Sequence, residues 1–183
     1  MHTRAHLLAA CALALGAATA APPVPSQSVT PDLSGTYVID RGASDDPKKA
    51  VEKATSSMRR FKRNALNKRL QDDMKTADTL RIAQRGDSVT LAASERVRMT
   101  VVPGTPKSRT GQRGGTVETA GEWQGNALLV KTTAERFQRE ARYSLEGDGS
   151  RIRVAIAMRA EQLSEPIRYT LVYRRVSNSA GSD

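Results

Sequence analysis

The chain has 183 residues, with 29 Lys and Arg against 19 Asp and Glu, a formal net charge of +10 and only 4% aromatic residues. This length suits one domain with a substantial core. Both histidines and the only cysteine lie in the first eleven residues, at His2, His6 and Cys11, so the rest of the chain lacks the groups that the common catalytic triads and zinc sites require.

Residues 1–20 have the pattern of an export signal. Arg4 precedes a long apolar run, and the small residues Ala18-Thr19-Ala20 are typical of a cleavage site. We expect a cut near Ala20 and a periplasmic or secreted protein. No later segment of the mature chain is apolar enough for a transmembrane span, and without cysteine its fold must be stable from packing alone.

An alternative interpretation of the same segment concerns the cysteine. Leu8-Ala9-Ala10-Cys11 resembles a bacterial lipobox, in which the cysteine is lipidated and becomes the new N-terminus. The protein would then be a lipoprotein anchored to a membrane at Cys11. Both alternatives predict export.

After the export signal we expect a single domain. Residues 21–32 are rich in Pro and Ser, which favours an extended leader over a packed element. The domain is expected over residues 33–176, and residues 177–183 form a polar tail.

The domain is predicted to open with a strand over residues 33–40, in which Tyr37 and Ile39 share one face. A helix is expected to begin at Asp46-Pro47. The Asp46 carboxylate can accept backbone N–H groups there, and a proline lacks the N–H that would otherwise be unpaired.

A helical insert is predicted over residues 47–77, directly after the first strand. Residues 48–76 contain neither Gly nor Pro, and their apolar residues follow a helical spacing in two stripes. The first stripe comprises Val51, Ala54, Met58, Phe61 and Ala65, and the second comprises Leu66, Leu70, Met74 and Ala77. At about 100° per residue the stripes point in directions more than about 90° apart. We therefore expect a bend or break near Asn64–Asn67, or a pair of helices.

The remaining sequence has the pattern of short strands separated by Gly and Asp turns. They are expected at residues 79–84, 88–93, 96–102, 116–123, 127–133, 136–145, 151–159 and 167–175, with a long flexible loop at 103–115. Strands at a spacing of roughly 8–12 residues favour an antiparallel sandwich or barrel. The predicted fold class is α+β: an antiparallel, 8–9-stranded barrel-like or strongly curved sheet with the helical insert after the first strand.

The last two predicted strands alternate most clearly. In residues 151–159 the apolar side chains take every second position, and Arg151, Arg153 and Arg159 lie between and beside them. In residues 167–175, Arg168 and Arg174 fall opposite the apolar positions. This pattern predicts a sheet with one packed face and one solvated, Arg-bearing face.

The two ends of the domain, Leu33-Ser34-Gly35-Thr36-Tyr37 and Tyr173-Arg174-Arg175, resemble the lipocalin pattern. Lipocalins open their first strand with Gly-x-Trp, and an arginine near the last strand packs across that ring. The opening is also similar to that of small exported bacterial proteins that begin with Leu-x-Gly-x-aromatic. The resemblance implies a lipocalin-like up-and-down barrel in which Gly35, Tyr37 and Arg174 hold the structural positions.

No catalytic residue, metal site or cofactor is predicted. The pairs Asp45-Asp46 and Asp72-Asp73 are better explained as a helix cap and as solvated or ion-paired carboxylates than as an acid/base couple. The glycines of residues 103–115 are not followed by the Gly-Lys-Ser/Thr of a phosphate loop. An enzyme built on carboxylates from distant strands is a third hypothesis, behind two non-enzymatic ones.

A basic surface is the strongest remaining feature. The helical insert carries a cluster of cations at Arg59, Arg60, Lys62, Arg63, Lys68 and Arg69. Such a cluster would attract anionic surfaces, although a solvated surface without a partner is the alternative. Export, and the apolar spacing of most aromatic residues, argue against a nucleic-acid partner. Trp123, beside a turn, is a candidate ligand contact.

Two functions therefore compete. The first is an exported, non-enzymatic binding or structural protein that holds a small apolar ligand or lipid inside a barrel. The second is a basic envelope protein that docks on anionic lipid or polymer through the helical cluster.

Overall fold

The computed structural model describes residues 30–74, 76–93, 97–111 and 114–178. The predicted export signal, the lipobox at Cys11, most of the leader and the end of the predicted tail lie outside the described residues.

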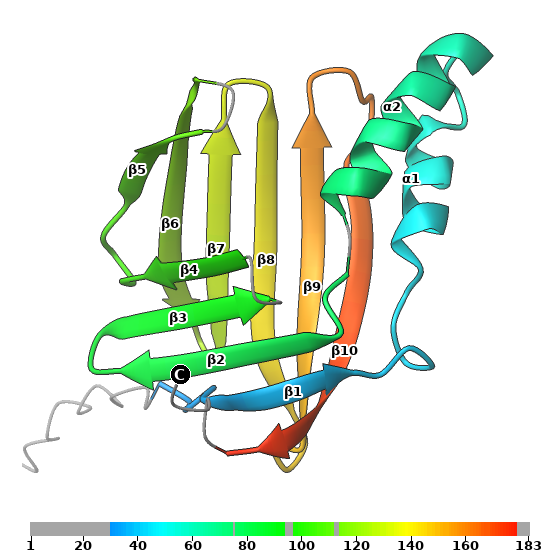
Figure 1. Ribbon diagram of the computed structural model, residues 1–183. Coiled ribbons are helices and arrows are strands. Elements are labelled where there is room, and N and C mark those ends of the chain that lie inside the picture. Colours follow the sequence, from blue (N-terminus) through cyan, green and yellow to red (C-terminus); the bar gives the residue numbers. More distant parts are fainter. Residues whose placement is uncertain (1–29, 75, 94–96, 112–113, 179–183) are drawn as a thin grey trace, which may run out of the picture.

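The described residues form ten strands and two helices (Figure 1). The strands are β1 (Gly35–Ile39), β2 (Thr79–Arg85), β3 (Ser88–Ala93), β4 (Val97–Val101), β5 (Lys107–Thr110), β6 (Thr116–Gln124), β7 (Ala127–Ala134), β8 (Phe137–Glu146), β9 (Arg151–Ala160) and β10 (Ile167–Ser177). The helices are α1 (Pro47–Thr55) and α2 (Arg60–Asp73), both between β1 and β2. The fold is thus mostly β, with the helices inserted after the first strand as predicted.

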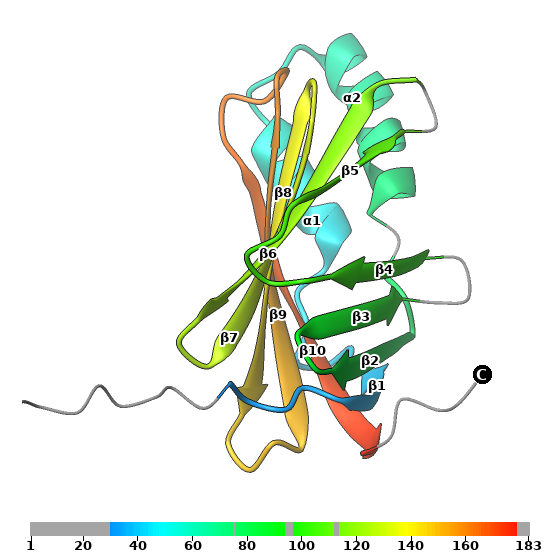
Figure 2. The ribbon, with the colours of Figure 1, turned by 90° about the vertical axis from the view of Figure 1, so that its left-hand side faces the viewer.

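All ten strands belong to one antiparallel sheet in the order β4-β3-β2-β1-β10-β9-β8-β7-β6-β5. Strands β6 to β10 run side by side, β1 to β4 cross them at one end and curl over one face, and the helices cover that same face further along (Figures 1 and 2). The curled part returns to β6, where the Gly104 N–H donates to the Gly121 carbonyl at 2.8 Å. The result is a nearly closed barrel.

The predicted number of strands, 8–9, is too low. The additional strand is β5, which falls inside the segment 103–115 that was expected to be a flexible loop. Its four residues are all exposed and it pairs with β6 at the edge of the sheet. No face of β5 is buried, so no apolar alternation marks it in the sequence.

The concave face of the sheet carries the core. On β9 every second side chain from Ile152 to Met158 is at most 4% exposed, while Arg151, Arg153 and Arg159 are exposed. This arrangement confirms the predicted packed face and Arg-bearing face of the last strands. Full burial of an aliphatic side chain contributes roughly 1.5–3 kcal/mol, so each of these side chains adds to the stability of the fold.

The first helix begins where the sequence predicts, and the break comes earlier than expected. The Asp46 carboxylate accepts the Lys48 backbone N–H at 2.9 Å, with Pro47 in the first turn. The chain leaves the helix at residues 56–59 rather than near Asn64–Asn67. The Thr55 hydroxyl lies 2.9 Å from the Val51 carbonyl oxygen and 2.8 Å from Asn67 Oδ1, so the last residue of α1 contacts α2 through this hydroxyl.

Because of this early break, only part of the first predicted apolar stripe is buried. Val51 is fully buried, whereas Phe61 is 88% exposed and Ala65 is exposed. The second stripe packs as predicted, with Leu70 and Met74 buried against the core. Helix α2 therefore contacts the barrel through its C-terminal half.

A tyrosine–arginine contact joins the two ends of the domain. Tyr37 is fully buried, and its hydroxyl donates to the Leu33 carbonyl at 2.8 Å and accepts from Arg175 Nη2 at 2.6 Å. The Arg175 guanidinium carbon lies 5.1 Å from the centre of the Tyr37 ring, within cation–π range. The arginine expected in this position was Arg174, but Arg174 points to the outer face, 3.8 Å from Asp40. Because side chains alternate along β10, Arg175 lies on the side of Tyr37 and Arg174 does not.

Gly35 permits this close contact. It has φ +154°, and a Cβ there would lie 2.8 Å from the Ser177 carbonyl oxygen and 3.2 Å from the Tyr37 ring. Any larger residue would push β1 away from β10.

Candidate functional site

The concave side of the sheet carries a cavity of about 930 Å³ that is partly open to solvent, which we call the inner cavity. Its walls come from β2–β4, β8–β10 and α2. Its apolar lining residues are Leu66, Leu70, Met74, Ala77, Leu80, Leu91, Ala93, Met99, Phe137, Val154, Ile156, Met158, Ala160 and Leu171. The helix and the sheet thus form one apolar chamber, as their complementary apolar faces dictate.

Three tyrosines add polar groups to this apolar wall. Tyr143, Tyr169 and Tyr173 line the inner cavity and are at most 7% exposed. The Tyr173 hydroxyl donates to the Ala77 carbonyl at 3.3 Å. Burial raises the pKa of Tyr169 and of Tyr173 above the usual value, so both phenols are neutral at physiological pH.

Three charged side chains also line the inner cavity: Asp78, Arg136 and Arg139. Asp78 pairs with Arg41, and Arg136 pairs with Glu161 at 3.4 Å. Arg139 is half-buried, and the part of the chain that the structure describes gives it neither a hydrogen bond nor an ion pair.

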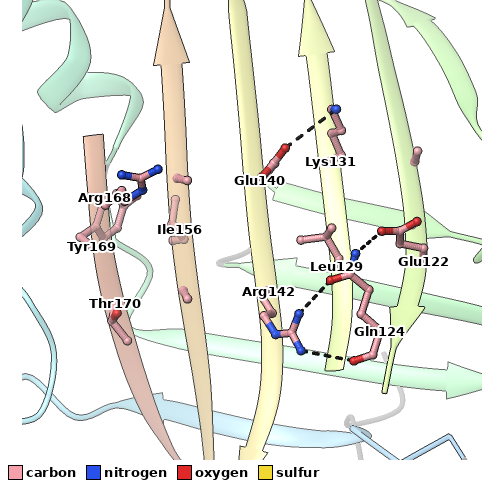
Figure 3. Close-up of a pocket in the computed structure, with 14 residues that line it drawn as sticks. Glu122, Gln124, Leu129, Lys131, Glu140, Arg142, Ile156, Arg168, Tyr169 and Thr170 are labelled. Atoms are coloured by element: carbon pink, nitrogen blue, oxygen red, sulfur yellow. Dashed lines mark hydrogen bonds and ion pairs between the residues drawn. The ribbon is translucent and has the colours of Figure 1, made fainter. Parts of the chain in front are cut away.

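A second hollow of about 750 Å³ lies on the convex side of β6–β10, and we call it the outer groove (Figure 3). Arg142 Nη1 donates to Gln124 Oε1 at 2.8 Å, and Lys131 lies 3.9 Å from Glu140. Gln124 in turn contacts Glu122. Polar side chains that bind one another therefore cross the floor of the outer groove, and Arg168 stands at its far side (Figure 3).

The structure separates the residues singled out from the sequence. Trp123 faces the concave side from β6, is half-buried against the core and lines neither hollow. Gly35, Tyr37 and Arg174 lie where β1 meets β10, away from the inner cavity lining.

The predicted basic cluster lies on α2 and the turn before it. Arg59, Arg60 and Lys62 are exposed and Arg63 is half-buried. Lys68 and Arg69 belong to α2, but their side chains lie outside the described residues. The N-terminal end of α2 stands clear of the sheet (Figure 1).

Arg139 and the three tyrosines were not predicted as site residues from the sequence. The available signal was alternation: along β8, Phe137, Arg139, Ala141 and Tyr143 occupy one face. An arginine that alternates in phase with apolar residues points to the same face of the sheet as they do.

The described residues contain no group of three or more Asp, Glu, His or Cys side chains placed to hold a metal ion. Neither of the two described helices has the length and apolar character needed to cross a bilayer.

No protein-family model matches the chain, and no curated protein sequence matches it. Among solved structures, it resembles a luciferase domain from the dinoflagellate Lingulodinium polyedrum with TM-score 0.51 and 20% identity, over 88% of this chain and 48% of that one. Two structures of the REP1-NXSQ fatty acid transporter, one of them a point mutant, give TM-scores of 0.49 and 0.47 at 16% and 17% identity. Both cover 79% of this chain and at least 96% of their own. At these identities and TM-scores, the luciferase-domain match shows the fold alone, a barrel-like antiparallel sheet.

Proposed function

We propose that the protein is an exported, non-enzymatic binding protein that holds a small apolar ligand or lipid in the inner cavity. The observation that carries the proposal is the cavity itself, about 930 Å³ with a mainly apolar lining and a few polar groups. Small-molecule sites have volumes of roughly 300–1,000 Å³ and the same kind of lining. The sequence of residues 1–20 supports export.

Titration with a neutral pyrene-labelled alkane tests this proposal. We expect saturable binding of one probe per chain, together with a rise in Tm because the ligand binds only the folded state. Native mass spectrometry of protein purified from its producing cells should show a co-purified lipid. Failure of the neutral probe to saturate, with no co-purified lipid, would contradict the proposal.

A second candidate function is docking on an anionic lipid surface through the start of α2. Phe61 is 88% exposed between the cations Arg60 and Lys62. The helix has no acidic residue in its first turn and no side-chain cap at Arg59. Cations at a helix N-terminus oppose its dipole, so this end is unfavourable for helix stability. An exposed aromatic ring flanked by cations suits the boundary between lipid headgroups and acyl chains.

Vesicle sedimentation tests the second candidate. We expect binding to vesicles of phosphatidylcholine with phosphatidylglycerol, weaker binding in high salt, and none to phosphatidylcholine alone. Each cation near such a surface contributes about 1 kcal/mol, so Arg60→Gln with Lys62→Gln should reduce binding about thirtyfold. The matched control, Arg151→Gln with Arg168→Gln, removes the same charge from the convex face. An equal loss of binding in both variants would show that binding depends on net charge alone, and it would contradict docking through α2.

A further inference from the structure

Arg139 is the charged residue of the inner cavity that lacks a protein partner among the described residues. It lies on β8 in phase with the buried Ala141 and Tyr143, so its side chain extends along the concave face. The other charged lining residues, Asp78 and Arg136, are each paired. A guanidinium against an apolar wall is unfavourable unless an anion or water binds it.

Strand register places Arg139 next to a small residue of the wall. Arg139 pairs with Met158, and the next inward row contains Ala141, Ile156 and Tyr169. Because Ala141 is small, the Arg139 side chain has room to lie over it toward Tyr169. The positive charge of Arg139 acts on the phenols of Tyr169 and Tyr173, where it lowers the pKa and partly offsets the effect of burial. The register thus places Arg139 beside the row that carries Tyr169.

Two tyrosine hydroxyls are also available to a ligand. The Tyr173 hydroxyl is bound to the Ala77 carbonyl, but those of Tyr143 and Tyr169 have no hydrogen-bond partner within the described residues. Both hydroxyl oxygens keep some exposed surface. Among the described residues, the only fully buried side-chain polar atom without a hydrogen-bond partner is Arg175 Nε. Each phenol can donate one hydrogen bond into the inner cavity.

We infer that Arg139 anchors the carboxylate of an anionic amphiphile whose apolar chain fills the inner cavity, with the hydroxyls of Tyr143 and Tyr169 as further donors. This inference rests on the proposed function and specifies its ligand class. The planar guanidinium fork matches the two oxygens of a carboxylate. One unpaired cation balances one negative charge, so a monocarboxylate fits better than a phosphate monoester, which would need a second cation.

Calorimetric titration with a matched ligand pair tests the inference. Dodecanoate and 1-dodecanol share a chain and differ at the headgroup. We expect the protein to bind dodecanoate at least tenfold more tightly, as a charge-assisted hydrogen bond requires. Arg139→Met should remove this preference while its affinity for 1-dodecanol stays within about threefold, since the apolar lining is retained. Arg142→Met, three residues along β8 but on the convex face, should keep the preference.

The outcomes separate the inference from the proposed function. Equal affinity of the unmodified protein for both ligands would overturn the role of Arg139 as the carboxylate anchor, while binding in the cavity stands. An Arg139→Met variant that keeps the preference, or that loses affinity for both ligands equally, would do the same. If neither ligand nor the neutral pyrene probe binds, the proposed function is overturned instead.

Tyr169→Phe provides a second variant that keeps the shape of the cavity, and it should reduce the dodecanoate preference by about twofold to fivefold. An unchanged preference in Tyr169→Phe would remove this tyrosine from the site.

Discussion

The inner cavity and the outer groove, of about 930 Å³ and 750 Å³, lie on opposite faces of strands β8–β10. On the convex face the polar groups bind one another, as Arg142 does with Gln124 and Lys131 with Glu140. On the concave face Arg139 lies against an apolar wall without a partner in the described residues. The same type of side chain is therefore satisfied by the protein on one face and left for a ligand on the other.

This difference shows why volume alone does not identify a site. The polar side chains of the outer groove already bind one another, so a ligand would have to displace existing hydrogen bonds. In the inner cavity an apolar ligand would replace water that has few partners, and an anion would satisfy a charge that the protein leaves unpaired. The contrast predicts different responses to the same kind of substitution on the two faces.

The largest expected effect comes from truncating a packed side chain. Ile152→Ala, on the concave face of β9, should lower the free energy of unfolding by about 2–5 kcal/mol because it leaves a cavity in the core. Arg153→Ala, the neighbouring residue on the convex face, should change it by less than about 1 kcal/mol. Urea unfolding of the two variants measures both values. Losses of equal size would contradict the assignment of the concave face as the core.

Alkaline pH should lower the stability of the protein through the buried tyrosines of the concave face. Burial raises the pKa of Tyr169 and Tyr173, so the folded state holds these protons at pH values where the unfolded chain, with a pKa of about 10, has lost them. Their contribution to stability is fully present below about pH 10 and is lost as pH rises toward the folded-state pKa. Tm measured from pH 8 to pH 11 should fall above about pH 10, less steeply in Tyr173→Phe. An equal slope in both proteins would show that other groups control alkaline unfolding.

A smaller effect is expected from the unpaired arginine itself. In the ligand-free protein, Arg139→Met should raise the free energy of unfolding by on the order of 1 kcal/mol, because it removes a charge from an apolar wall. The same exchange at Arg142, on the convex face, should lower it slightly through loss of the hydrogen bond to Gln124. Opposite signs in urea unfolding would sharpen the contrast between the faces. A destabilised Arg139→Met would indicate that the protein itself satisfies Arg139.

The smallest effect is expected from the exposed ion pair of the outer groove. Lys131 and Glu140 are both about half exposed and 3.9 Å apart, so Lys131→Met should change the free energy of unfolding by less than about 0.5 kcal/mol. The free energy of unfolding of Lys131→Met, compared with that of the unmodified protein at low and at high salt, measures this contribution. A loss above about 1 kcal/mol would mean that the outer groove is more than a solvated surface.

The sequence predicted the parts of the fold that local patterns determine. Strict alternation identified the packed and Arg-bearing faces of β9 and β10, and Asp46-Pro47 marked the start of α1. The break at residues 56–59 was misplaced. The two helices meet there through the contact between Thr55 and Asn67, and apolar spacing does not encode such a contact. Strand β5 was missed because none of its residues is buried.

The site was less predictable than the fold. The cavity depends on strand order and on where α2 lies over the sheet, and neither follows from local periodicity. The alternation of β8 does place Arg139 on the apolar face, yet only the fold shows that Tyr143 and Tyr169 lie beside it and that it has no partner within the described residues. The basic cluster of the insert, by contrast, was evident from composition alone, and its role remains a proposal.

Binding of the neutral pyrene-labelled alkane to two neighbouring variants of β9 tests the central proposal most directly. Val154 lines the inner cavity and Ala155 lines the outer groove, so Val154→Phe and Ala155→Phe add an aromatic ring on opposite faces of one strand. We predict that Val154→Phe, whose ring takes up part of the inner cavity, weakens probe binding at least tenfold in protein that remains folded, while Ala155→Phe leaves the affinity unchanged. Equal affinity in both variants, or a loss confined to Ala155→Phe, would contradict binding in the inner cavity.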